Sequence, residues 1–184
     1  HNTTQNTYFE TIQAAVNAAA EGDEIEVAAG TYEFTEQMNI DKGLSITGQG
    51  TVIFQANNDS WSTTNGYKHL IGIYAGTQSS PITITNVTMD CNSQNYGLNT
   101  YANAYGVLDD VTINNSVAAG LTVNGSTIIA TNLNTSGNAW GAVNVDPGSG
   151  VTDPSIFTLN SGTLSESNQI WSDRSNVTAT ATVT

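Results

Sequence analysis

The sequence predicts an all-β solenoid, a fold in which short strands stack coil upon coil. Asn86, Asp110 and Asn132 hold the same place in a recurring strand pattern, at steps of about 22–24 residues. A second series keeps nearly the same step: Gly97-Leu98, Gly120-Leu121 and Gly141-Ala142. Because an antiparallel sandwich has no reason to repeat side chains at matched positions, the shared period favours stacked coils.

An amphipathic helix is predicted ahead of the strands, over residues 8–21. Apolar residues collect on one helical face at three- and four-residue steps: Phe9, Ile12, Val16 and Ala19. Thr7 or Thr11 is expected to cap the start of this helix, and Gly22 is a natural stop signal.

Beyond the helix the hydrophobic period changes to two, which is typical of half-buried strands. Pairs of apolar residues alternate with polar ones: Ile25 and Val27, Met38 and Ile40, Leu44 and Ile46, Val52 and Phe54. We expect coils over residues 24–165 and a terminal coil with a tail strand over 166–184. Together with the helix they form a single domain spanning 1–184, since this length fits one core.

The N-terminal third carries a recognisable pattern, made of four segments: Thr11–Val16, Gly22–Val27 (GDEIEV), Gly30–Glu33 (GTYE) and Leu44–Gly48. This pattern resembles the opening of the pectate-lyase-like right-handed parallel β-helix superfamily. The resemblance implies a right-handed parallel β-helix whose first coil is covered by a short N-terminal capping α-helix. Near the end, Gln169–Asp173 is similar to the closing coils of some surface-protein members, which implies the non-catalytic type.

The enzymes of that superfamily act on polysaccharides, and their catalytic sets are not found in this sequence. The Arg that a lyase or esterase needs is missing from the middle coils, because the one Arg, Arg174, lies in the last coil. Neither His1 nor His69 sits between glycines, as a polygalacturonase would require. We therefore expect no catalytic residues, and a lyase-like activity stays open as the alternative.

Charge excludes several partners. The chain has 3 Lys+Arg against 16 Asp+Glu, a formal net charge of −13, so no basic surface neutralises a run of phosphates. Nucleic acid is thereby excluded as a partner, and the lack of a long apolar run argues against membrane insertion. The wealth of uncharged polar residues and the single Cys are typical of an extracellular or cell-surface protein.

Candidate ligand sites follow from the repeat. Asn86, Asp110 and Asn132 are expected to stack at an inward turn position as a hydrogen-bonded ladder. Asp109 and Asp110 are a candidate calcium site, the only cofactor considered. The alternative is that one carboxylate points inward and the other into solvent, since neighbours on a strand face opposite ways.

Aromatic residues suggest a glycan surface. Tyr101 and Tyr105 flank one Ala/Asn-rich loop and Trp140 precedes a later strand, so one groove is expected to collect them for a neutral glycan. They are equally suited to filling the corners of coils.

Other residues point to contacts between copies. Cys91 is either a buried core residue or a thiol that bridges two copies. Val177 and Val183 lie in a strand-prone tail that pairs with the domain itself or with a neighbouring copy.

These features lead to one expected function. The protein is expected to be an extracellular structural or adhesive β-helix that self-associates into a cell-surface layer, sheath or filament. Its partners are then copies of itself or neighbouring surface proteins. The alternative is a carbohydrate-binding or polysaccharide-active, lyase-like module that binds a neutral glycan.

Overall fold

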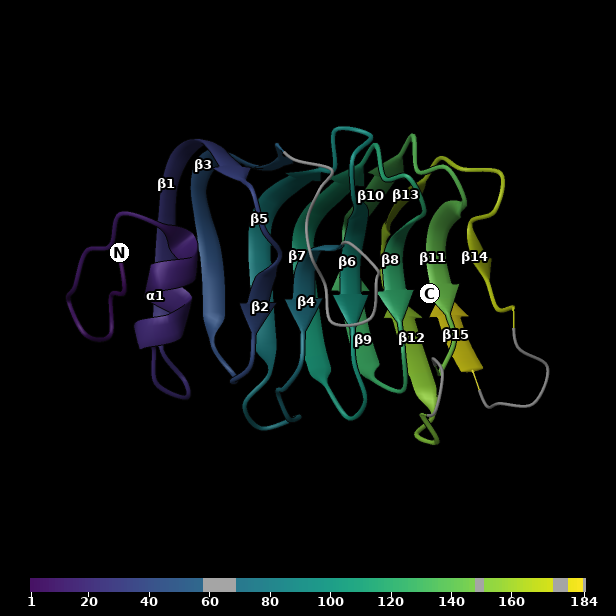
Figure 1. Cartoon of the computed structure of the whole chain (residues 1–184). Helices are drawn as coiled ribbons and strands as arrows, with labels where there is room; N and C mark the ends of the chain where they lie inside the picture. Colours follow the sequence, from purple (N-terminus) through teal and green to yellow (C-terminus); the bar gives the residue numbers. More distant parts are fainter. Residues whose placement is uncertain (58–68, 148–150, 174–178, 184) are drawn as a thin grey trace.

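The computed structural model describes residues 1–57, 69–147, 151–173 and 179–183. It is an all-β parallel β-solenoid of about six turns with one short helix near the N-terminus, so the predicted fold class is confirmed (Figure 1). Two parallel sheets run the length of the stack.

Sheet A has nine strands. Its main path is β1 (Glu24–Phe34), β3 (Ser45–Ala56), β5 (Ile82–Asp90), β7 (Tyr105–Asn114), β9 (Thr127–Thr131), β12 (Ser155–Leu159) and β15 (Ala179–Val183). Off this path, β10 (Leu133–Ser136) pairs with β7 and with β13 (Gly162–Leu164). Sheet B runs in the order β14 (Ile170–Trp171), β11 (Gly141–Val145), β8 (Ala119–Val123), β6 (Tyr96–Thr100), β4 (His69–Ile73) and β2 (Met38–Ile40).

The core is built from columns of inward side chains that repeat from coil to coil. One column, in strict register through six strands of sheet A, is Ile25, Ile46, Ile84, Leu108, Ala130 and Leu159. Every member of it is buried. Since sheets A and B enclose these columns in one hydrophobic core, stacking the coils removes the apolar surface from water.

The recurring Asn and Asp mark a bend in the chain. Asn86, Asp110 and Asn132 have φ angles of 51° to 55°, the left-handed region that Asn and Asp tolerate better than most residues. At Asp110 the alternation of β7 breaks, because the half-buried Asp109 and the exposed Asp110 both lie outside the core. All three residues are exposed, so the expectation of an inward turn position was wrong.

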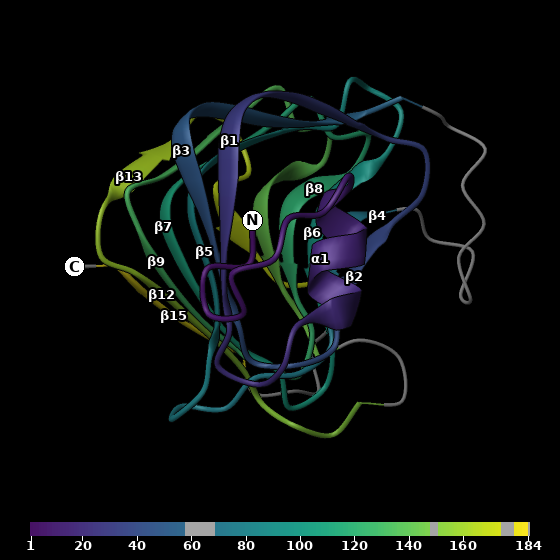
Figure 2. The same cartoon turned by 90° about the vertical axis from the view of Figure 1, so that its left-hand side faces the viewer.

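The helix is shorter than predicted. Helix α1 spans Ile12–Ala18 because Thr11 is extended and its Oγ1 accepts a hydrogen bond from the backbone N–H of Ala14 at 3.1 Å. Ala19 is extended as well, so the helix ends before the Gly22 stop signal. Figure 2 shows α1 beside β2 at the N-terminal end of the stack. No helix among the described residues is long and apolar enough to cross a membrane.

Candidate functional site

Two aromatic pairs lie at opposite ends of the strands of sheet B. Tyr74 follows β4 and Tyr101 follows β6, and their rings stack with centroids 4.1 Å apart and an interplanar angle of 10°. Gln37 Nε2 donates a hydrogen bond to Tyr74 Oη at 2.9 Å. Burial and the neighbouring Tyr101 hydroxyl raise the pKa of Tyr74 well above its usual range, so its hydroxyl stays protonated.

The second pair involves Trp140, which is 53% exposed. Its ring lies 5.5 Å from that of Tyr96, at the start of β6, with a tilt of 56°. Trp140 therefore belongs to the end of the strands opposite Tyr101. The predicted grouping of Tyr101, Tyr105 and Trp140 in one groove is replaced by two separate aromatic pairs.

Tyr105 lies in a third place, a polar hollow of about 290 Å³ beside the turns that lead from sheet B to sheet A. Other residues lining this turn hollow include Gln78, Asn103, Thr127 and Asp153. An aromatic ring beside amides, a hydroxyl and a carboxylate offers both stacking and hydrogen bonds to a polyhydroxyl ligand.

His69, at the start of β4, supplies a pH-dependent contribution to stability. It is 5% exposed, and its ring meets Tyr96 edge-on at 5.2 Å. Burial lowers the pKa of His69 to about 4, against an ordinary value of about 6.5. As the pH falls below about 6.5 the unfolded chain takes up the proton first, so stability is lost until the pH reaches about 4.

We therefore expect His69 to remove about 2 to 3 kcal/mol of unfolding free energy between pH 7.5 and about pH 4.5. Urea unfolding at the two pH values measures the loss, and His69→Phe is the matched variant because it keeps an aromatic ring. The variant should lose less stability than the wild type over the same interval. Equal losses in both proteins would contradict the assignment.

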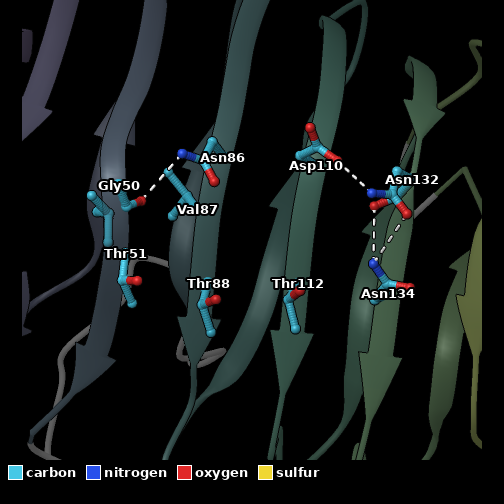
Figure 3. A pocket seen from close by; sticks show the side chains of 10 residues that line it. Gly50, Thr51, Asn86, Val87, Thr88, Asp110, Thr112, Asn132 and Asn134 are labelled. Carbon is cyan, nitrogen blue, oxygen red and sulfur yellow. Dashed lines mark hydrogen bonds between the residues drawn. The ribbon is translucent and has the colours of Figure 1, made fainter. Parts of the chain in front are cut away.

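A second, larger hollow of about 550 Å³ follows the bend of sheet A across four coils (Figure 3). In this corner groove Asn132 Nδ2 donates to Asp110 Oδ1, a link between neighbouring coils. Asn86 Nδ2 instead donates to the carbonyl oxygens of Gly48 and Gly50, at 2.8 and 3.2 Å. Of the three residues predicted to form a ladder, only Asp110 and Asn132 are joined to each other by one of these side-chain bonds.

The candidate calcium ligands share the outer side of the bend. Asp109 is half-buried and Asp110 is exposed, so neither carboxylate points into the core. In the part of the chain that the structure describes, no group of three or more His, Cys, Asp and Glu side chains is arranged to hold a metal ion.

The residues predicted to contact other copies lie in different environments. Cys91 is fully buried, and burial, followed by the charge of Asp90, raises the pKa of its thiol to about 12. A bridge to a second copy through Cys91 therefore requires local opening. Val183, in β15, is 64% exposed. Val177 lies outside the described residues.

A buried polar column that was not predicted from the sequence lies in the turns that lead from sheet A to sheet B. Asn95, Ser116 and Asn138 are buried there, on successive coils. Asn138 Oδ1 accepts from Ser116 N–H at 2.9 Å, and Asn138 Nδ2 donates to Glu166 Oε1 at 2.6 Å. The spacing from Asn95 to Ser116 to Asn138 is also about 22 residues, so the repeat period itself was the available signal.

Comparison with known proteins adds no family. The chain matches no protein-family model, and no curated protein matches it. The parallel β-solenoid architecture is consistent with a β-helix superfamily and does not identify a family within it.

Proposed function

We propose that this protein is an extracellular structural module that self-associates into a cell-surface layer, sheath or filament. One observation carries the proposal. Strands β13, β14 and β15 at the C-terminal end of the stack each pair with a single strand among the described residues. Unpaired strand edges are templates for pairing with another chain. With this function we also propose that the protein is related to the non-catalytic surface proteins of the pectate-lyase-like superfamily.

The size of the native particle tests this proposal. Light scattering coupled to gel filtration, followed by negative-stain microscopy, is expected to show ordered assemblies of the 19.3 kDa chain. A protein that stays monomeric at every concentration, with no ordered particles on the grid, contradicts the proposal.

A second candidate function is the binding of a neutral glycan, favoured by the turn hollow around Tyr105 and by the stacked pair of Tyr74 and Tyr101, whose second member precedes Tyr105 in the chain by one short loop. Tyr101 and Tyr105 bound a single loop, and the backbone N–H of Ala104 within that loop donates to Tyr101 O at 3.0 Å. This short loop keeps the stacked pair and the hollow close together along the chain. An extended glycan is thereby offered an aromatic face next to amide groups.

A glycan array followed by calorimetry on the retained glycan tests this candidate. We expect Tyr105→Ala to weaken binding about tenfold, the loss of one aromatic stacking contact. The matched control is Tyr8→Ala, since Tyr8 is 78% exposed and belongs to the N-terminal segment. No retained glycan, or equal weakening by both variants, argues against a binding site in the hollow.

A further inference from the structure

The two ends of the solenoid differ in the state of their strand edges. At the C-terminal end β13 pairs with β10, β14 with β11 and β15 with β12, and no further partner lies among the described residues. The longest of these edges is β15, whose five residues pair in parallel with the whole of β12. Among the described residues, all three faces of the last coil therefore have one side without a strand partner.

Two of the three strand edges at the N-terminal end are closed by contacts within the chain. His1 N donates to Glu26 O at 2.9 Å, Glu26 N to His1 O at 2.8 Å, and Thr3 N to Glu24 O at 2.8 Å. These bonds occupy the outer edge of the first part of β1. The later part of β1, from Ala28 to Phe34, pairs with β3 and has no second strand among the described residues.

The edge of β2 is closed by a side chain of the helix. Gln13 Oε1 accepts from the backbone N–H of Asn39 at 3.0 Å, and Gln13 Nε2 donates to Asn39 O at 3.3 Å. This amide satisfies both backbone groups of the central residue of β2, as a neighbouring strand would. Two of the three faces of the first coil are thus unavailable to a second chain.

The two ends of the solenoid also differ in charge, and this difference likewise favours contact through the C-terminal end. Residues 1–45 hold eight of the 16 Asp and Glu and one Lys, whereas residues 151–184 hold Asp153, Glu166, Asp173 and one Arg. Two N-terminal ends brought together therefore place about fourteen like charges face to face, which costs free energy. Two C-terminal ends meet with the smallest repulsion of any end-to-end arrangement.

We propose that two copies of this chain join through their C-terminal edges, about a two-fold axis that runs across the stack. A two-fold axis makes the contact self-complementary, and it sets β15 of one copy antiparallel to β15 of the other. A head-to-tail stack, in contrast, must displace His1–Thr3 from β1 and Gln13 from β2. The proposal rests on the proposed self-association and names its first interface.

Thr182→Lys tests the interface because Thr182 is an exposed residue of β15. Lysine on an edge strand opposes pairing, and the two-fold axis brings the new charge of each copy toward the other. Sedimentation equilibrium at the lowest protein concentrations is expected to show a wild-type species of two 19.3 kDa chains, the unit from which larger assemblies grow. The variant should raise the dissociation constant of this dimer at least tenfold.

Thr85→Lys is the matched control, since Thr85 faces outward on β5 and that strand has partners on both sides, β3 and β7. It should leave the dimer unchanged, and equal melting temperatures for the two variants show that both fold. Assemblies that grow from the monomer with no two-chain species overturn the two-fold contact but keep self-association. A wild-type monomer overturns both, and a dimer that Thr182→Lys leaves intact overturns the C-terminal interface alone.

Discussion

Replacing Phe54 by Ala is expected to lower the free energy of unfolding by about 3 to 5 kcal/mol, the usual cost of removing a buried aromatic ring. Phe54 lies on β3 with no exposed area. Its ring contacts that of Phe34 at 5.4 Å and that of Tyr32 at 6.4 Å, both edge-on. In register it lies between Tyr32 on β1 and Met89 on β5, so the cavity opens inside a column that spans three coils.

Urea unfolding at neutral pH measures this loss, and Ile53→Ala is the matched control. Ile53 is the neighbour of Phe54 on the same strand, faces outward and is half-buried. Its truncation should cost about 1 kcal/mol or less, because partly exposed side chains contribute little beyond their small buried area. Similar losses for the two variants would mean that the column around Phe54 relaxes into the space, against close packing of the coils.

The solenoid could be predicted from the sequence because equivalent residues of successive coils recur at a regular spacing. Each coil presents the same positions to the next, so Ile84 and Leu108 recur one period apart and lie in register. The same period pointed to Asn86, Asp110 and Asn132 as a related set. The role of these residues was misjudged, since a left-handed φ angle turns the chain and leaves the side chains exposed.

The candidate site was predicted less well, because it depends on which end of a strand a side chain occupies. Tyr101 and Trp140 are both close to strands of sheet B, but one follows a strand and the other precedes one. Counting residues within a loop does not reveal that difference unless the strand limits are known to within one or two positions. The closed N-terminal edges depend on the side chain of Gln13 and on the path of His1–Thr3, neither of which belongs to the repeat.

The second prediction with a large effect concerns the buried polar column in the turns. Substitution by leucine is expected to change the free energy of unfolding in opposite directions at its two asparagines. We expect Asn138→Leu to lower the free energy of unfolding by about 3 kcal/mol or more, since it removes every bond that the amide makes. Besides the bonds to Ser116 and Glu166, Asn138 Nδ2 donates to Ile113 O at 3.0 Å. Leucine cannot replace any of these bonds, so buried polar groups in two neighbouring coils lose a partner.

Asn95→Leu is the matched substitution on an earlier coil of the same column, and we expect it to raise stability by about 1 to 3 kcal/mol. Asn95 has no exposed area, and neither its Oδ1 nor its Nδ2 has a hydrogen-bond partner among the described residues. Leucine has the same number and branching of side-chain heavy atoms as asparagine, and it removes the cost of this buried amide. Ser116, the next member of the column, already uses its Oγ within its own turn by donating to Ala119 O at 2.9 Å.

Urea unfolding of the two variants tests whether the hydrogen bonds of the polar column are complete at Asn138 and missing at Asn95. Stabilisation by Asn95→Leu beside destabilisation by Asn138→Leu means that the polar column is completed only toward the C-terminal coils, where Glu166 accepts two bonds from Asn138 through Oε1. A large loss from both substitutions would instead require a partner for the Asn95 amide, and the interruption of the column at Ser116 would then be refuted.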